Sequence, residues 1–412
     1  MNTLLVNLFL LLCYLRYNRA QPFSARKWLK ALEEDGYDSS IPPGVLTGQP
    51  THVAVTIYVE SIGNFQPLAM EYEVDLYLSE YWVDKRLEHN LTFCIHLNLR
   101  NDMDRVWQPD LFLANSKEAR YNDITVPNHS FQICSDGQVR YSVRINCKLQ
   151  CQMNLRRFPF DHQACHIKML PYGNNTTRVI LRWHEHGIRR NLQLQEADLQ
   201  MERAEANLCN GSYIVGNYSC LMAEFFFRRT VSQSMLQIYC PSFSIVCISW
   251  ISFWIDPTSV PGRVGLAVTT LLTLATQTAG IAFTMPSVGY AKALDIWLSI
   301  CLLFLFGSLI EFTLVNMYTR RWQSITRKDI GSMKASLKNK YEIYKLVNAS
   351  NYADTTPKFP LMTMGEDNYE RVRSEVCERF RQKAKKIDKV SRALFPALFA
   401  IFMLTYFIVF AW

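Results

Sequence analysis

The first half of the chain alternates between apolar and polar residues, and the second half gathers apolar residues into long runs. Apolar residues recur at nearly every second position over 53–59, 74–78 and 139–145. A period of two predicts β-strands that bury one face, and Asp136-Gly137 is a typical hairpin turn. Short strands spread over about 180 residues predict a β-sandwich.

Four apolar segments follow, over about 236–255, 264–283, 294–317 and 394–412, each near the length of a membrane-spanning helix. The second segment is unusually polar. On a helix, its small and hydroxylated residues share one face with a single bulky aliphatic residue; this face includes Gly265, Thr269, Leu272, Thr276 and Phe283. Such a stripe indicates a water-filled pore, and an ordinary buried helix in a bundle is the alternative.

The N-terminus carries a short apolar run, Leu4–Leu15, followed by the small residue Ala20. This pattern indicates a cleaved signal peptide over 1–20, with an uncleaved anchor as the alternative. Cleavage would place residues 21–235 outside the cell. Six acceptor sequences for N-glycosylation fall in that part of the chain; they begin at Asn90, Asn128, Asn174, Asn175, Asn210 and Asn217.

Charge and cysteine content support the same topology. Residues 319–392 carry 18 Lys and Arg against 9 Asp and Glu, and basic loops remain cytoplasmic. The basic excess therefore reflects topology and does not indicate nucleic-acid binding. Seven cysteines would be extracellular, so at least one is unpaired or bonds to another chain. Two close pairs enclose thirteen and ten residues; they are Cys151 with Cys165, and Cys209 with Cys220.

The sequence contains no glycine-rich phosphate loop, zinc-finger spacing or nucleophile elbow, and nothing in it indicates an enzyme, a cofactor or a resident metal. Its most specific motifs are instead Trp107–Asp110, Phe158-Pro159-Phe160-Asp161, Trp250–Trp254, Pro261–Arg263, Thr269–Thr273 and Lys292–Trp297. With these motifs in this order, residues 25–412 resemble the Cys-loop receptors, and within them the anion-selective glycine receptors and invertebrate ligand-gated chloride channels. Cys151 and Cys165 resemble the disulfide that closes the loop of the whole family, and Cys209 and Cys220 resemble the extra disulfide of glycine-receptor-like subunits.

The resemblance implies an extracellular all-β sandwich followed by an all-α domain of four transmembrane helices, in a ring of five subunits. The corresponding divisions are a signal peptide (1–20), a ligand-binding sandwich (21–235), helices one to three (236–318), a cytoplasmic loop (319–392) and helix four (393–412). The protein is then expected in the plasma membrane, as at a synapse, as a multi-pass chloride channel. Its partners would be four identical or homologous subunits, lipid, chloride and a small extracellular agonist.

The resemblance places Pro261, Gly262 and Arg263 at the inner mouth of the pore. Cation-selective relatives carry an acidic residue where this chain has Gly262. Without that carboxylate, and with Arg263 at the positive end of a helix, the mouth is expected to favour chloride. The alternative is that Arg263 anchors the helix at the membrane surface. Leu272 resembles the hydrophobic gate, and Gly265 is the candidate for the narrowest part of the open pore.

The resemblance also places an agonist site between subunits. Its principal face would include Tyr172, Gly173, Tyr213, Val215 and Tyr218, and its complementary face Tyr77, Ser79, Ser142 and Arg144. Aromatic cages hold amines through cation–π attraction. Ser79 replaces the arginine of amino-acid-gated relatives, Leu170 replaces a glutamate, and Val215 replaces a hydroxyl residue. These losses favour an amine that lacks a carboxylate.

Two other interpretations remain open at the level of sequence. His184 and His186 lie two apart and would face the same side of a strand, which suits a trigger by zinc or protons. Alternatively, the chain is a structural subunit that binds no agonist. In either case, Phe158, Pro159, Phe160 and Asp161, with the loop that ends at Lys292, are expected to couple the sandwich to the pore.

Overall fold

The computed structural model describes residues 23–191, 199–332 and 366–411. The predicted signal peptide lies outside the described residues, as does the part of the predicted cytoplasmic loop over 333–365. The chain divides into two compact units. The first contains residues up to Asn154 together with His162–Arg229, and the second contains Leu155–Asp161 and everything from Thr230 onward.

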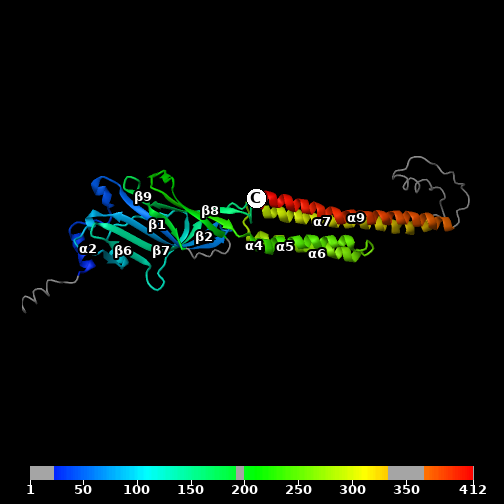
Figure 1. Ribbon diagram of the computed structural model, residues 1–412, viewed down its shortest axis with the longest axis horizontal. Helices are drawn as coiled ribbons and strands as arrows, with labels where there is room; N and C mark the ends of the chain where they lie inside the picture. Colours follow the sequence, from blue (N-terminus) through cyan, green and yellow to red (C-terminus); the bar gives the residue numbers. More distant parts are fainter. Residues whose placement is uncertain (1–22, 192–198, 333–365, 412) are drawn as a thin grey trace, which may run out of the picture. The chain divides into compact units, whose positions relative to one another are not determined.

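The first unit is built on two antiparallel-rich sheets (Figure 1). The larger sheet has the order β3-β6-β7-β2-β1-β9, with β5 also paired to β7. Its strands are β1 (Thr51–Gln66), β2 (Glu71–Val83), β3 (Ile95–Leu97), β5 (Ser116–Tyr121), β6 (His129–Ile133), β7 (Gln138–Gln150) and β9 (Val179–Arg190).

The smaller sheet has the order β10-β13-β8-β4, and a separate hairpin pairs β11 with β12. The strands are β4 (Leu111–Leu113), β8 (His162–Pro171), β10 (Leu199–Leu208), β11 (Ser212–Tyr213), β12 (Gly216–Asn217) and β13 (Leu221–Arg229). Short helical segments complete the unit; they are α2 (Ala25–Glu34), η1 (Pro43–Thr47), η2 (Lys85–Leu87) and α3 (Arg100–Met103).

The predicted alternation is confirmed in the two central strands. In β2, every second side chain from Tyr72 to Trp82 is buried, and its neighbours on the strand are partly exposed. This pattern gives the sheet one apolar face for the core and one polar face outside. The predicted turn at Asp136-Gly137 joins β6 to β7, and Gly137 adopts a φ of 73° that glycine accepts without strain. The inward series contains one carboxylate, Glu80.

The second unit is helical. Its elements are α4 (Val231–Ser234), the π-helical segment η3 (Met235–Tyr239), α5 (Cys240–Trp250), η4 (Ile251–Trp254), α6 (Val260–Thr284), α7 (Ala293–Ser332) and α9 (Glu366–Ala411). Within this unit, α7 packs against α6 and α9, and α5 packs against α6 and α7. Among the described residues, four stretches are long and apolar enough to span a membrane; they are Val231–Trp254, Val260–Thr284, Ala293–Arg320 and Arg381–Phe410.

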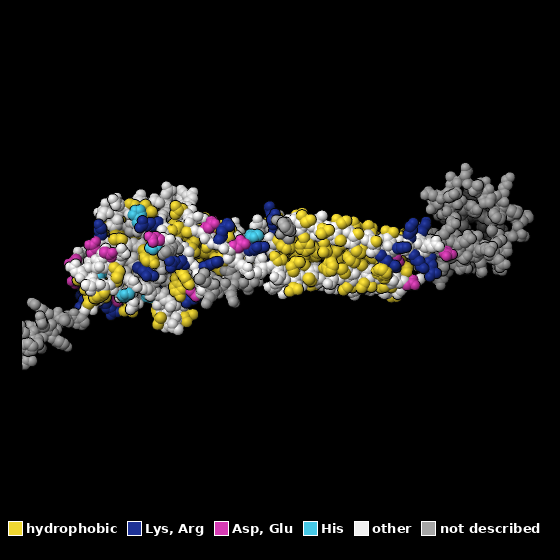
Figure 2. Space-filling view, viewed as in Figure 1, with side chains coloured by type: hydrophobic (Ala, Val, Ile, Leu, Met, Phe, Trp, Pro, Cys, Tyr) yellow, Lys and Arg dark blue, Asp and Glu magenta, His cyan; other side chains and the backbone are white. Residues whose placement is uncertain are grey.

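The outer surface of this unit is apolar along α7 and α9. Figure 2 shows a broad band of hydrophobic side chains over the helices, bordered by Lys and Arg. Residues such as Leu303, Phe306, Leu404 and Ile408 are more than half exposed. In a protein that sits in water such a band would be unfavourable, but in a bilayer it meets the acyl chains. The fold class predicted from the sequence is therefore confirmed.

Three disulfides stabilise the first unit, and the sequence suggested two of them. Cys151 bonds to Cys165 and Cys209 to Cys220. The third joins Cys94 to Cys134, which lie 40 residues apart. Of the seven extracellular cysteines counted from the sequence, Cys147 is left as a free thiol, buried on the inner face of β7.

Candidate ligand faces, pore face and coupling contacts

The outer face of β2 and β7 brings together the four residues expected on the complementary side of the agonist site. Ser79 pairs with Ser142, and Tyr77 with Arg144, as direct cross-strand neighbours. The two serine hydroxyls lie 2.9 Å apart and hydrogen bond to each other. The guanidinium carbon of Arg144 lies 5.4 Å from the centre of the Tyr77 ring, within cation–π range. Tyr58 of β1 packs edge-on against the same ring.

Arg144 is not a free cation. Its Nε atom lies 3.1 Å from each carboxylate oxygen of Asp75, and its Nη2 atom also contacts Asp75. This is the two-pronged geometry in which arginine binds carboxylates most strongly. The sequence pattern placed Arg144 on the site but did not identify Asp75 as its partner.

The residues expected on the principal side lie on the β8–β9 loop and on the β11–β12 hairpin. The Tyr172 ring is 78% exposed and lies edge-on to Phe112. Tyr213 and Tyr218 of the hairpin lie edge-on to each other, with ring centres 6.0 Å apart. Val215 at the hairpin tip is 81% exposed. Tyr172 and Tyr213 are therefore exposed, while Tyr218 is half-buried.

Two further residues of this side were missed from the sequence. Phe112 of β4 lies beside Tyr172, and the Lys168 ammonium of β8 lies 5.6 Å from the centre of the Tyr213 ring. Both are brought into place by strand pairing, which a sequence motif does not reveal. Leu170, by contrast, is buried at 1% exposure. It therefore serves the core and offers nothing to a ligand.

A buried carboxyl lies behind the principal side. Glu80 is 3% exposed, and no hydrogen-bond partner for its Oε2 atom lies within the described residues. Burial, and then the nearby charge of Asp110, raise the pKa of Glu80 to about 8. Asp110 itself accepts hydrogen bonds from the backbone N–H of Gly173 and from Asn174. The protonation of Glu80 is thus linked to the loop that carries Tyr172.

The polar stripe of α6 is exposed, as the pore hypothesis requires. Gly265, Thr269, Leu272 and Thr276 all lie on the exposed side, with Leu272 at 62% exposure. The opposite side is packed into the unit through Ala267, Thr270 and Leu274. A helix in a single subunit that leaves this face uncovered has a surface for water or for neighbouring subunits.

The threonine hydroxyls of α6 donate hydrogen bonds to backbone carbonyls of the same helix. Thr269 donates to the Gly265 carbonyl at 2.8 Å, and Thr276 donates to the Thr273 carbonyl at 2.9 Å. This back-bonding keeps the hydroxyls within the helix. The exposed stripe therefore offers hydroxyl oxygens and methyl groups and contains no charge.

The side chain of Arg263, which is expected from the sequence at the inner mouth of the pore, is buried and does not extend that stripe. Arg263 is fully buried, and its two terminal nitrogens donate to the two carboxylate oxygens of Asp388 in α9, at 3.0 and 2.8 Å. Its Nε atom donates to the Ile255 carbonyl. Because both partners lie within the same unit, the charge is neutralised inside the subunit. Pro261 and Gly262, by contrast, are exposed.

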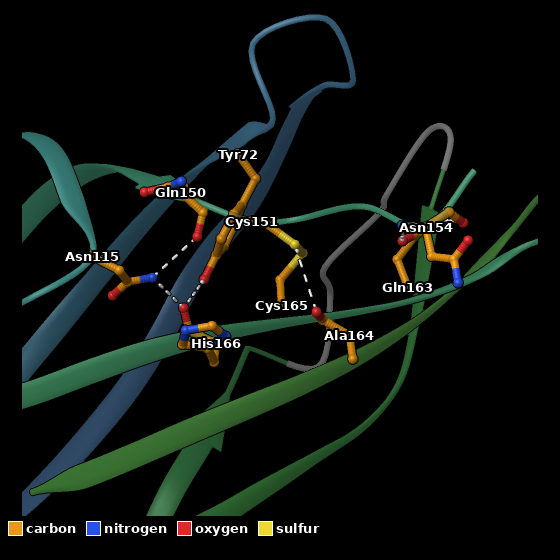
Figure 3. Close-up of a disulfide and its surroundings, with 9 residues drawn as sticks. All are labelled: Tyr72, Asn115, Gln150, Cys151, Asn154, Gln163, Ala164, Cys165 and His166. Carbon is orange, nitrogen blue, oxygen red and sulfur yellow. Dashed lines mark hydrogen bonds between the residues drawn. A yellow bond between two sulfur atoms is a disulfide. The ribbon is translucent and has the colours of Figure 1, made fainter. Parts of the chain in front are cut away.

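The loop between Cys151 and Cys165 is fixed at its root (Figure 3). Beyond the disulfide, Gln163 accepts from the Asn154 N–H at 2.9 Å and donates to the Asn154 carbonyl at 2.8 Å. The Tyr72 hydroxyl donates to the His166 carbonyl next to Cys165. These bonds hold the two arms of the loop close together.

The tip of the same loop packs within the helical unit. The Tyr290 hydroxyl accepts from the Leu155 N–H at 3.0 Å, and the Arg156 carbonyl accepts from the Ala293 N–H at 2.8 Å. The Phe160 ring lies 6.3 Å from Tyr239 and 6.2 Å from Phe407, centre to centre. Of the predicted coupling residues, Phe160 therefore packs against η3 and α9, while the unpredicted Leu155 and Arg156 bond to the loop before α7 and to the first residue of α7.

Lys292 belongs to the same loop before α7. It is 8% exposed, and its ammonium lies 3.4 Å from the Asp295 carboxylate and 3.5 Å from the Pro286 carbonyl. These two contacts of Lys292 hold together the loop between α6 and α7. Phe158, Pro159 and Asp161 complete the tip, and Phe158 and Asp161 are buried.

The histidine pair is only partly described. The His184 ring packs 4.8 Å from Tyr81, and the side chain of His186 lies outside the described residues. No cluster of three or more metal-ligating side chains occurs within the described parts of the chain. Among the predicted glycosylation sites, Asn90, Asn210 and Asn217 are exposed, while Asn128, Asn174 and Asn175 are half-buried.

The first unit is a β-sandwich with exposed aromatic loops. The second unit has four membrane-length helices, one of which, α6, carries an uncharged polar stripe. Together these features define the class of ligand-gated channels. Comparison with known proteins agrees. Residues 25–231 match the neurotransmitter-gated ion-channel ligand binding domain, and residues 238–358 match the neurotransmitter-gated ion-channel transmembrane region. A glutamate-gated chloride channel of Drosophila melanogaster is 36% identical over 402 residues, covering 90% of this chain and 88% of the relative.

The chain belongs to the neurotransmitter-gated ion-channel family, and it is a multi-pass membrane protein and a subunit of a pentameric ligand-gated chloride channel. The resemblance stated from its motifs is confirmed. The family consists of ion channels and is not a class of enzymes.

Proposed function

We propose that this subunit forms a chloride channel opened by a small cationic amine that lacks a carboxylate. One observation carries the proposal. At the position where a carboxylate-binding arginine is expected, Ser79 and Ser142 satisfy each other at 2.9 Å. Serine hydroxyls cannot supply the two parallel charged hydrogen bonds of a guanidinium. The exposed ring of Tyr172 remains as a binding group for a cation.

In this proposal, five copies of α6 line the pore with the stripe from Gly265 to Thr276. Leu272 forms the gate by excluding water from a narrow apolar ring. The disulfide-closed loop, through Phe160 and its neighbours, transmits movement of the sandwich to the helices. The partners are four identical or homologous subunits, and a postsynaptic membrane is one setting for such a receptor.

The relative from Drosophila is named for glutamate. Glutamate carries two carboxylates at neutral pH. In this chain the arginine of the complementary side is engaged by Asp75. We therefore propose that the agonist differs from glutamate although the channel architecture is shared.

A channel opened or modulated by protons is the second candidate, and Glu80 supports it. Its pKa of about 8 means that the carboxyl exchanges its proton near neutral pH. Asp110 links it to the Tyr172 loop. A pH step applied without any agonist tests this candidate directly.

The deciding experiment expresses the full chain alone in oocytes and applies histamine, tyramine, glycine, GABA, glutamate, zinc and pH steps. An amine should open a current that reverses at the chloride potential and follows that potential when external chloride is replaced. A response confined to amino acids would contradict the proposed agonist class. A silent chain that reaches the surface would instead indicate a structural subunit of a mixed channel.

A further inference from the structure

The outer face of β2 and β7 carries two arginines that each lie over a tyrosine ring but differ in whether a carboxylate pairs with them. Arg140 and Arg144 lie two residues to either side of Ser142 on β7, and both face outward. Arg140 lies over the Tyr81 ring at 5.5 Å, and Arg144 lies over the Tyr77 ring at 5.4 Å. Arg144 is held by Asp75, whereas Arg140 makes no ion pair within the described residues.

The pairing of Arg144 is favoured by its surroundings. The Asp75 side chain is only 12% exposed and that of Arg144 is 28% exposed, so water screens the pair incompletely. A second carboxylate, Glu60 of β1, also acts on Arg144 and is held in place by Asn191. Two acidic groups therefore surround one cation beside Tyr77, and this part of the face carries no net positive charge.

The position of Arg144 matters for ligand charge. In an antiparallel pair, diagonal neighbours lie about 7–8 Å apart, within reach of a long side chain. Because Ser79 is directly opposite Ser142, Ser79 has two diagonal neighbours on β7, Arg144 on the side of Tyr77 and Arg140 on the side of Tyr81. A guanidinium released from Asp75 could extend over the two serines from the side of Tyr77, where a ligand carboxylate would otherwise find hydroxyl groups and an arginine already bound to Asp75.

We propose that Asp75 sets the ligand preference at the Tyr77 side of this face: with its carboxylate on Arg144, this side accepts cationic amines and rejects ligands that carry a carboxylate. Asp75 is a specificity-determining residue that acts through Arg144 and does not touch the ligand itself. This inference rests on the proposed agonist site and names the residue that fixes its ligand class.

The test compares ligands that differ only in a carboxylate, histamine with histidine and tyramine with tyrosine, together with GABA and glutamate. Asp75→Asn keeps the shape of the side chain and removes its charge. The ratio of half-maximal concentrations, carboxylate ligand over amine, should fall by about tenfold or more, the effect of one additional charged contact of moderate strength. Asp75→Glu keeps the charge and should preserve the wild-type ratio.

Matched double variants assign the effect to one arginine. Asp75→Asn with Arg144→Gln should return the ratio to its wild-type value, because the released cation is gone. Asp75→Asn with Arg140→Gln should keep the fall in the ratio. If the Arg140 variant cancels the effect and the Arg144 variant does not, the proposal is overturned. An unchanged ratio in Asp75→Asn overturns it as well.

Binding measured without gating separates this inference from the proposed function. Purified full-length receptor is heated with increasing GABA or glutamate, and bound ligand raises the melting temperature by mass action. Asp75→Asn should gain a ligand-dependent rise that wild type lacks, even if no tested ligand opens the channel. If neither protein shows a rise, the proposal fails. A rise in the melting temperature of Asp75→Asn without any current would support the role of Asp75 and count against the proposed opening of the channel by an amine.

Discussion

Two arginine residues that are expected from the sequence at functional positions are each neutralised by an aspartate. Arg144 meets Asp75 on the sandwich, and Arg263 meets Asp388 among the helices. Residue type alone suggests a cation at both positions, one for a ligand and one for the pore mouth. The partners change that interpretation, because a paired guanidinium contributes little free charge to its surroundings. At this scale, function depends on which acid each arginine meets.

Glu80 gives a residue-scale prediction about stability and pH. Its pKa is about 8 in the folded protein and 4.5 in the unfolded chain, so the folded state binds more protons between these values. The free energy of unfolding should therefore fall as the pH rises from about 4.5 to 8, by at most about 1.4 kcal/mol per pH unit. The contribution is complete below pH 4.5 and lost above pH 8.

Glu80→Gln removes the titrating proton, so the melting temperature of the purified receptor should depend less on pH through this window. The variant should gain most at pH 8 relative to wild type. Glu73→Gln, on the same strand but facing outward, serves as the control and should leave the slope unchanged. Identical slopes in Glu80→Gln and wild type would show that this carboxyl does not titrate there.

At the scale of elements, the buried ion pair joins the pore helix α6 to the final helix α9. Removing one partner of a buried pair leaves an uncompensated charge and costs about 3–5 kcal/mol, whereas replacing both with apolar residues is often neutral. Asp388→Asn should therefore reduce surface receptors strongly. Arg263→Met combined with Asp388→Leu should restore them. Surface labelling of tagged receptors measures both.

The same double variant tests the source of ion choice. The Arg263 charge is already cancelled within the subunit, so its removal together with Asp388 should leave the current reversing at the chloride potential. Asp256→Asn, in the turn before α6, is the control for a loss of negative charge nearby. A reversal potential that moves away from chloride in the double variant would show that Arg263 does contribute to selectivity.

At the scale of the whole molecule, the exposed stripe of α6 can line a pore only in a ring of five subunits. One Leu272 side chain in water is an ordinary exposed leucine, but five around an axis form an apolar constriction that excludes water. Leu272→Thr should weaken that barrier and produce a resting chloride current without agonist. Recording from unstimulated oocytes measures it.

Leu271→Thr is the matched control for the gate. It makes the same change one position along the helix, about 100° around its axis and on a partly buried side. It should leave the resting current near zero. A silent Leu272→Thr channel that still reaches the surface would argue against Leu272 as the gate.

The sequence alone determined the architecture, because periodicity and length are local properties. Alternation over 74–78 specified a strand with one buried face, and the run over 264–283 specified a helix with an uncharged stripe. The motifs from Trp107 to Trp297 identified the family.

Only the tertiary structure decided which charged side chains of these sites are neutralised by a partner. Asp75 and Arg144 lie 69 residues apart, and Arg263 and Asp388 lie 125 apart. Whether such pairs meet depends on strand register and helix packing, which bring distant residues within about 3 Å and which no local pattern encodes. The same holds for the Cys94–Cys134 disulfide and for Lys168 beside Tyr213. The physical reason is that electrostatic and covalent contacts depend on distance in space, whereas a sequence records distance along the chain.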